Sequence, residues 1–173
     1  MKNLDAYNLA ANQYYARQDI KGLPLLSWDF YQDTLDQIYK HGSDVVLLSE
    51  LAKKNKWDYP IPNQTELLES KQIVVVTNPL LDIVYATQNM FLMNGYRPAE
   101  VLGKKPKLFQ GKGTCKSTLA SIGLAVRNRI PFEATILNYR KNGTSYNCWI
   151  KGEPVFDSAG ELVNFIAFEK EVA

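Results

Sequence analysis

Cysteine and histidine are scarce in this chain of 173 residues. It has two cysteines, Cys115 and Cys148, and a single histidine, His41. The cysteines show no paired C-x-x-C spacing, so the sequence indicates neither a zinc site nor a disulfide framework. No Ser-His-acid, Cys-His or metal-ligand set can be assembled from these residues with any specificity. We therefore expect a protein that is not an enzyme and binds no metal.

Long apolar runs and an excess of one charge are also missing. No apolar stretch approaches the roughly 20 residues that span a bilayer, and residues 1–5 contain no apolar signal core. Lys and Arg number 20 against 18 Asp and Glu, which gives a net charge of +2. Such a mixed charge argues against a dedicated nucleic-acid surface or a basic membrane helix. We expect a cytoplasmic protein, and its 46% hydrophobic content is enough for a core.

Residues 1–70 have the pattern of helices. Apolar and aromatic side chains recur at helical spacing over residues 5–18, 28–39 and 45–51, with glycine or proline between these stretches. Tyr59-Pro60-Ile61-Pro62 cannot be helical and predicts a connector, followed by a short helix at residues 65–70. The first part of the chain is thus predicted to be a helical extension.

From Ile73 onward the pattern changes to strands and short helices. The predicted order is two strands, several short helices and then three antiparallel strands, which indicates an α+β fold. The predicted strands are residues 73–77, 82–85, 132–140, 144–156 and 162–170. The predicted helices are residues 89–96, residues 98–102 and a longer helix that is capped by Thr114 or Ser117 and ends near Asn128.

The dipeptide Asn142-Gly143 predicts a tight hairpin turn, because both residues tolerate a positive φ. A two-residue turn would place Tyr139 opposite Tyr146 and Asn138 opposite Asn147. The two asparagine amides could then satisfy each other, or they could offer donors and acceptors to a planar polar ligand.

Both faces of this hairpin carry large apolar side chains, so neither can be fully exposed to water. We expect one face to close a pocket with the short helices. The other face needs a cover, from residues 1–70 of the same chain or from a partner chain, and we favour the same chain.

Several segments, taken in order, resemble the PAS superfamily and, within it, the LOV branch. The segments are 73–78, 86–91, Asn94-Gly95-Tyr96, Glu100-Val101-Leu102-Gly103, 132–134, 138–143 and Phe165-Ile166-Ala167. The resemblance implies a PAS fold, in which a five-stranded antiparallel sheet carries short helices on one face. It also implies two parts, residues 1–70 as a helical extension that packs on the sheet or at a dimer interface, and residues 71–173 as the PAS domain.

In the LOV branch, a glycine-bounded segment similar to Gly103–Gly111 carries the photoactive cysteine. Lys105-Pro106-Lys107 stand here where that family has Asn-Cys-Arg. The resemblance therefore implies that residue 106 forms no flavin–thiol bond. Lys107 keeps the charge of a phosphate-binding arginine without its bidentate fork, and Gly123 stands where a second such arginine is usual.

The resemblance also names candidate ligand-binding residues. Gln110, Asn138 and Asn147 match positions that contact the flavin ring, and Glu169 stands in place of a glutamine that signals to flavin N5. Lys105 and Lys107 complete the candidate set. A neighbouring lysine group has two interpretations, a solvated basic loop or a partner for an anionic ligand, with Lys107 as its best candidate; its members are Lys104, Lys105, Lys107, Lys112 and Lys116.

The expected function is a sensory or signalling module that binds a small ligand or a partner protein. It would transmit by rearrangement of helices or of a homodimer, without cysteine photochemistry. The cofactor is left open, and FMN or another flavin would make the protein a redox sensor instead. A DNA-binding regulator is a third hypothesis, because residues 48–54 resemble the first helix of a helix-turn-helix, but residues 57–62 stand where a recognition helix should be.

Overall fold

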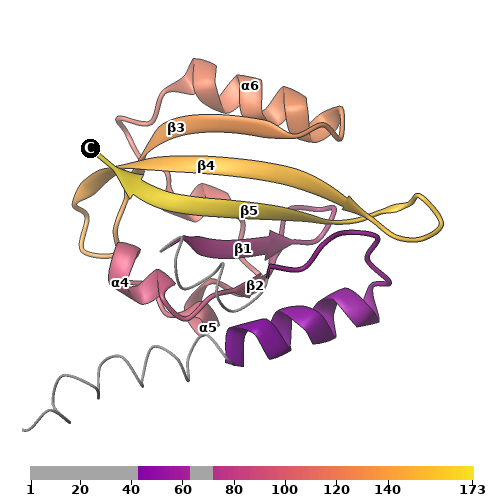
Figure 1. Ribbon diagram of the computed structural model, residues 1–173. Helices are drawn as coiled ribbons and strands as arrows, with labels where there is room; N and C mark the ends of the chain where they lie inside the picture. Colours follow the sequence, from indigo (N-terminus) through magenta and orange to yellow (C-terminus); the bar gives the residue numbers. More distant parts are fainter. Residues whose placement is uncertain (1–42, 63–71) are drawn as a thin grey trace, which may run out of the picture. The chain divides into compact units, whose positions relative to one another are not determined.

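The computed structural model describes residues 43–62 and 72–173. A helix occupies residues 43–54. The elements that follow are β1 (Ile73–Thr77), β2 (Ile83–Ala86), α4 (Met90–Asn94), α5 (Pro98–Val101), the 3-10 helix η1 (Pro106–Phe109), α6 (Lys116–Arg127), β3 (Phe132–Tyr139), β4 (Ser145–Phe156) and β5 (Leu162–Val172) (Figure 1).

The predicted order of strands and helices after Ile73 is confirmed, with bounds that shift by a few residues. Two details differ from the sequence-based prediction. Cys115, rather than Thr114 or Ser117, is the N-cap residue of α6, and the short helix η1 was not expected. The helices predicted at residues 5–18, 28–39 and 65–70 lie outside the described residues.

The five strands form one antiparallel sheet in the order β2-β1-β5-β4-β3. The last strand of the chain, β5, therefore lies between β1 and β4 at the centre of the sheet (Figure 1). All five residues of β1 are buried, because this strand is covered on both faces. That burial explains why its sequence, IVVVT, is continuously β-branched instead of alternating with polar residues.

One face of the sheet, here called the helical face, is covered by the short helices and α6. Beneath α4, α5 and η1, a core cluster joins β1 and β2 to Met90, Val101 and Phe109. Under α6, the cluster of β3 and β4 packs against Leu119 and Ile122. Met90, Val101 and Phe109 thus have their partners on this face, whereas Phe91 and Leu92 of α4 are exposed.

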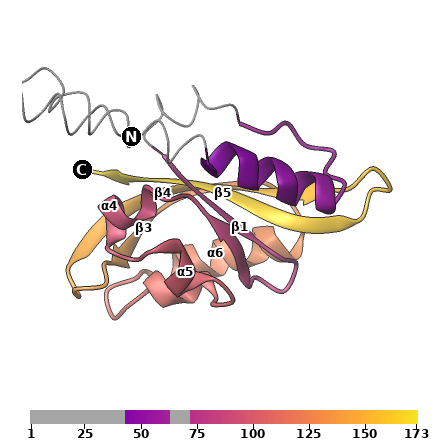
Figure 2. The same ribbon diagram turned by 90° about the horizontal axis from the view of Figure 1, so that it is seen from below.

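The opposite face, here called the outer face, is covered over β1 and β5 by the helix at residues 43–54 (Figure 2). Leu48 of this helix is fully buried against Val74, Val76 and Ile166. The same chain therefore supplies a cover for this part of the outer face. Burial of one leucine side chain stabilises such packing by about 1.5–3 kcal/mol.

Polar contacts fix the segment after this helix. Buried Asn164 of β5 donates from Nδ2 to the carbonyl of Thr77 at 2.9 Å. Its Oδ1 accepts hydrogen bonds from Asn55 Nδ2 at 2.9 Å and from Trp57 Nε1 at 2.8 Å. One amide thus joins two strands and the end of the helical segment, with both of its polar atoms satisfied.

A second anchor lies near the start of the described helix. The carboxylate of buried Asp44 accepts hydrogen bonds from the hydroxyl of Tyr85 and from the backbone N–H of Gln88, each at 3.0 Å. Tyr85 lies near the end of β2 on the outer face, so this contact ties the helix to the edge of the sheet. The helix is therefore held by directional bonds as well as by apolar packing.

The predicted pairing of the β3–β4 hairpin is wrong by one residue. Asn138 lies opposite Tyr146, and Leu137 lies opposite Asn147. Because side chains alternate along a strand, a shift of one residue moves every side chain of β4 to the other face.

The physical reason is a loop of three residues instead of two. The Arg140 N–H donates to the carbonyl of Thr144 at 2.8 Å, and the Gly143 N–H donates to the carbonyl of Arg140 at 2.9 Å. Within this loop Gly143 alone adopts a positive φ, of 87°, as the last position of such loops requires. Asn142 instead uses its Oδ1 to accept from the Thr144 N–H at 3.0 Å.

Candidate ligand-binding site

The corrected register decides which side chains of β4 reach the interior. Tyr146 and Cys148 are buried on the helical face, whereas Asn147 is exposed on the outer face. Asn138, at 2% exposure, remains in the interior opposite Tyr146. The predicted pair of asparagine amides is therefore not formed, and a tyrosine and a thiol stand beside Asn138 in place of Asn147.

Five polar side chains meet on the helical face, and we refer to them as the interior polar cluster. They come from α4, β3, β4 and β5, and each is 5% exposed or less. The members are Asn94, Asn138, Tyr146, Cys148 and Glu169. Buried polar side chains that gather from four separate elements are unusual in a core that is otherwise apolar.

Three atoms of this cluster lack hydrogen-bond partners among the described residues. They are Asn94 Nδ2, Asn138 Oδ1 and the Tyr146 hydroxyl. The other amide atom of Asn94 is engaged, since Oδ1 accepts the Tyr96 N–H at 3.0 Å. The large majority of buried side-chain polar atoms have partners in folded proteins, and an unmatched one costs about 1–3 kcal/mol. Three together mark a place where a ligand could supply the missing partners.

Glu169 is the charged member of the cluster. Cys148 Sγ lies 3.7 Å from its Oε2 and donates the one hydrogen bond that the carboxyl receives from the described residues. Its cross-strand neighbours, Ile150 on β4 and Ile73 on β1, are apolar. Burial raises the pKa of Glu169 to about 7, and the Cys148 thiol opposes this only in part.

The two other titratable members are held in their protonated forms. Burial raises the pKa of Cys148, and the carboxyl of Glu169 raises it further. Burial likewise raises the pKa of Tyr146. Cys148 and Glu169 raise this pKa further, and the nearby side-chain amides of Asn138 and Asn94 oppose this in part. Near neutral pH the cluster therefore contains a thiol, a phenol and a carboxyl that is close to its midpoint of ionisation.

Arg140, in the loop after β3, closes the cluster at the hairpin end. Its Nη2 lies 2.7 Å from Glu171 Oε1 near the end of β5, and its Nη1 donates to the carbonyl of Met93 in α4. Its Cζ lies 4.5 Å from the centre of the Tyr146 ring. One guanidinium thus contacts α4, β4 and β5 beside the interior polar cluster.

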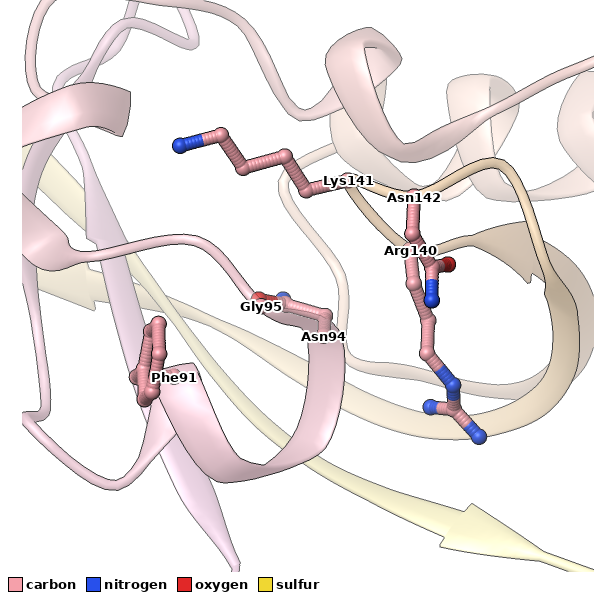
Figure 3. A pocket seen from close by; sticks show the side chains of 6 residues that line it. All are labelled: Phe91, Asn94, Gly95, Arg140, Lys141 and Asn142. Atoms are coloured by element: carbon pink, nitrogen blue, oxygen red, sulfur yellow. The ribbon is translucent and has the colours of Figure 1, made fainter.

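A shallow, open pocket of about 310 Å³ lies between the end of α4 and the hairpin loop (Figure 3). Its lining residues are Phe91, Asn94, Gly95, Arg140, Lys141 and Asn142. Asn94 belongs both to this pocket and to the interior polar cluster, so the pocket reaches the edge of the cluster. The Lys141 side chain extends away from Arg140 and bonds to Glu100 (Figure 3).

The structure does not bring all of the predicted site residues together. Asn138 and Glu169 lie in the interior polar cluster. Lys105 instead donates to the carbonyl of Leu80 at 2.6 Å and pairs with Asp82 at 3.0 Å, which holds the β1–β2 turn.

The two remaining predicted site residues are Lys107, within η1, and Gln110, at its end. Lys107 is exposed and has no ion pair among residues 43–62 and 72–173, and partly buried Gln110 makes no side-chain hydrogen bond within the same ranges. All members of the predicted lysine group are exposed, which fits the solvated interpretation.

Sequence reasoning missed Asn94, Tyr146 and Cys148. The strict alternation of β4 would have identified Tyr146 and Cys148 if the loop had been assigned three residues. Asn94 carried a weaker signal, since it belongs to the Asn94-Gly95-Tyr96 segment that was taken only as part of the family frame.

Comparison with known protein families identifies the family to which this chain belongs. Residues 71–172 match the PAS domain family, and the chain belongs to that family. Within it, the similar proteins and structures are of the LOV kind, which supports a LOV-like branch.

Among the relatives, the chain is 35% identical to phototropin-2 of Oryza sativa subsp. japonica over 97 residues, which cover 56% of this chain and 11% of that protein. It is 31% identical to the protein TWIN LOV 1 of Arabidopsis thaliana over 102 residues, 57% of this chain and 26% of that protein. It is 29% identical to a blue-light-activated histidine kinase of Brucella ovis, with 57% of this chain and 21% of that protein covered. The likeness thus spans a small part of each relative.

Two solved structures show the same fold. A light-oxygen-voltage domain studied with a flavin analogue superposes with a TM-score of 0.60 at 26% identity, covering 67% of this chain and 87% of that one. The light-state structure of the Aureochrome1 LOV domain gives a TM-score of 0.58, also at 26% identity, and covers 64% and 90% of the two chains.

The residues present do not reproduce the flavin partners that the LOV resemblance implies. Asn147 is exposed on the outer face, and a buried carboxyl, Glu169, stands in the interior. Lys107 is exposed, and nothing lies within 4 Å of a Cβ built on Gly123. Of the expected ring contacts, Asn138 alone is a buried member of the interior polar cluster.

The described residues also bear on DNA, membrane and metal binding. Leu48 is buried against the sheet, and Trp57 forms a bridge with Asp157 where a recognition helix would begin. Residues 58–62 are not helical. Within the described ranges, no helix is long and apolar enough to cross a membrane, and no group of three His, Cys, Asp or Glu could hold a metal.

Proposed function

We propose that this chain is a sensory PAS module, without enzymatic activity of its own, that binds a small molecule at the interior polar cluster. The observation that supports the proposal is the set of buried, unmatched polar atoms on Asn94, Asn138 and Tyr146. A ligand with complementary donors and acceptors would remove the cost of leaving these atoms unpaired.

The ligand would be recognised without a thiol adduct in the Gly103–Gly111 segment. Pro106 is the first residue of η1, and this segment contains no cysteine. Cys115 is exposed at the N-cap of α6, and Cys148 is buried on β4. Sensing by reversible binding therefore replaces cysteine photochemistry in this proposal.

Arg140 offers the route by which binding would be transmitted. A ligand that displaces the Tyr146 ring changes the surface on which the guanidinium lies. The same guanidinium is bonded to Glu171 and to the carbonyl of Met93. A shift at the site would thus reach the end of β5 and helix α4, where a partner protein or a second copy of the chain would respond.

The test compares two asparagines that lie on opposite faces of the same hairpin. Asn138→Leu removes a member of the interior polar cluster. Asn147→Leu changes an exposed residue in the neighbouring cross-strand pair of the hairpin. Freshly purified proteins are denatured, and the released small molecules are identified by mass spectrometry. We expect a molecule from the unmodified chain and from Asn147→Leu, and its loss from Asn138→Leu. Equal release from both variants, or none from the unmodified chain, would contradict the proposal.

A flavin-dependent redox sensor is the second candidate. The burial of Asn138 at a position that matches a ring contact favours it. A visible absorption spectrum of the same preparation separates the candidates, because a bound flavin is yellow and a non-flavin ligand lacks that band. Release of a flavin would make redox sensing the leading function.

A further inference from the structure

We propose that the ligand of the interior polar cluster presents N–H donors, as an amidine or an amino-substituted heterocycle does, to Glu169 and Asn138. This inference rests on the proposed function and specifies its ligand class. It follows from an imbalance between hydrogen-bond acceptors and donors in the cluster.

Glu169 contributes most of the imbalance. An ionised carboxylate can accept about four hydrogen bonds, and among the described residues Glu169 receives one, from the weak donor Cys148. At 5% exposure it has little access to water. Buried carboxylates are normally paired or ligated, so this one lacks the partner that its position requires.

Asn138 adds a second unmatched acceptor. Its Oδ1 is buried without a donor among the described residues, and its amide lies near enough to Tyr146 and Cys148 to influence the pKa of both. Asn94 Nδ2 is the one unmatched amide donor of the cluster, and the Tyr146 hydroxyl can act either way. A complementary ligand therefore needs more donors than acceptors.

The cations nearest in the strands and the hairpin are already engaged. Arg140 pairs with Glu171, Lys141 pairs with Glu100, and Lys170 lies 4.9 Å from the Trp149 ring on the outer face. None of the described lysines or arginines forms a salt bridge with Glu169. Among the described residues, Glu169 thus has no cationic partner, and a ligand could supply one; an amidinium matches the two carboxylate oxygens with two parallel N–H bonds.

This class differs from a neutral flavin in its pH dependence. A ligand edge that accepts hydrogen bonds needs Glu169 protonated, whereas an amidinium needs it ionised. The titratable groups that face Glu169 are Cys148 and Tyr146 of β4. On its own strand, the adjoining Lys170 lies over Trp149 on the outer face, and Glu171 pairs with Arg140, so no described cation faces the carboxyl. Amidinium binding should therefore strengthen as pH rises through about 7.

The experiment titrates the full chain with three probes in a calorimeter: benzamidine, its neutral isostere benzamide, and FMN. Measurements at about pH 6 and about pH 8 bracket the pKa of Glu169, and benzamidine stays cationic throughout. We expect benzamidine to bind roughly tenfold more tightly at the higher pH, as one linked proton allows. Glu169→Gln should abolish binding and its pH dependence, and Glu161→Gln, in an exposed turn, should change neither.

The other outcomes separate a wrong ligand class from a wrong proposed function. If benzamide or FMN binds and depends on Asn138 while benzamidine does not, the ligand class is wrong and the proposed function stands. Benzamidine binding that weakens at the higher pH would also overturn the class, and this readout needs no variant to fold. If none of the probes binds and no molecule co-purifies with the chain, the proposed function fails as well.

Discussion

The guanidinium of Arg140 lies 4.5 Å from the centre of the Tyr146 ring. Tyr146 belongs to the interior polar cluster, and Arg140 lines the open pocket at the hairpin. The contact therefore joins the buried candidate site to a surface that a partner could reach. Its remaining bonds, to Glu171 and to the carbonyl of Met93, make Arg140 the shared neighbour of three elements.

Replacement of Arg140 by lysine tests this connection. Lysine keeps the charge but cannot lie flat on the ring and bond to both partners at once. We expect Arg140→Lys to lower the free energy of unfolding by about 1–2 kcal/mol, measured by urea denaturation. The matched control is Lys141→Met, which removes an exposed ion pair with Glu100 and should leave the free energy of unfolding almost unchanged. Equal losses in the two variants would contradict the role assigned to Arg140.

Asn164→Ala should destabilise the protein by about 2–3 kcal/mol, because it leaves the buried Thr77 carbonyl and the half-buried Trp57 indole N–H without their partner. Equilibrium unfolding with tryptophan fluorescence measures this loss. Asn147→Ala, at an exposed position of β4, should change stability by no more than about 0.5 kcal/mol. A small effect of Asn164→Ala would mean that its hydrogen bonds contribute little to holding the segment after the described helix.

The two cysteines should differ sharply in reactivity. Hydrogen bonds from the side chains of Ser117 and Thr118, and then from their backbone N–H groups, lower the pKa of exposed Cys115 to about 6. Cys148 is buried and its pKa is raised. Iodoacetamide at neutral pH should alkylate Cys115 alone, as peptide mass spectrometry would show, and Ser117→Ala should slow that reaction. Rapid labelling of Cys148 in the native protein would contradict the buried position of this residue on β4.

Glu169 should make stability depend on pH in an uncommon direction. Its folded-state pKa is about 7 against a usual value of 4.5, so between these pH values the folded state binds the proton more tightly than the unfolded state. The free energy of unfolding then decreases as pH rises from 4.5 to about 7, by up to about 3 kcal/mol from this residue.

The measurement is urea denaturation of the unmodified chain and of Glu169→Gln across this pH range. Their difference isolates the residue, and the variant should gain stability relative to the unmodified chain as pH rises. Glu161→Gln should run parallel to the unmodified chain. A constant difference between Glu169→Gln and the unmodified chain would show that the carboxyl is solvated or paired in the folded state.

The sequence predicted the strands and their order because those signals are local. A β-branched run at residues 73–77, alternating strands near the C-terminus and turn residues between them each act within a few positions. The ordered family segments then gave the fold, and two members of the interior polar cluster, Asn138 and Glu169, followed from them. These parts of the prediction did not depend on knowing which residues touch across the fold.

The sequence did not decide the hairpin register, because Asn142-Gly143 suits a two-residue loop as well as a three-residue one. The packing of Ile136, Tyr146 and Cys148 beneath α6 is satisfied in one register and lost in the other. That choice removed Asn147 from the site and brought in Cys148.

Lys105 shows the same limit at longer range, since its partner Asp82 lies 23 residues earlier in the chain. The sequence by itself thus determined which elements form and in what order, through local preferences. The tertiary structure alone decided which polar side chains share the interior, because that depends on register and on contacts between distant residues.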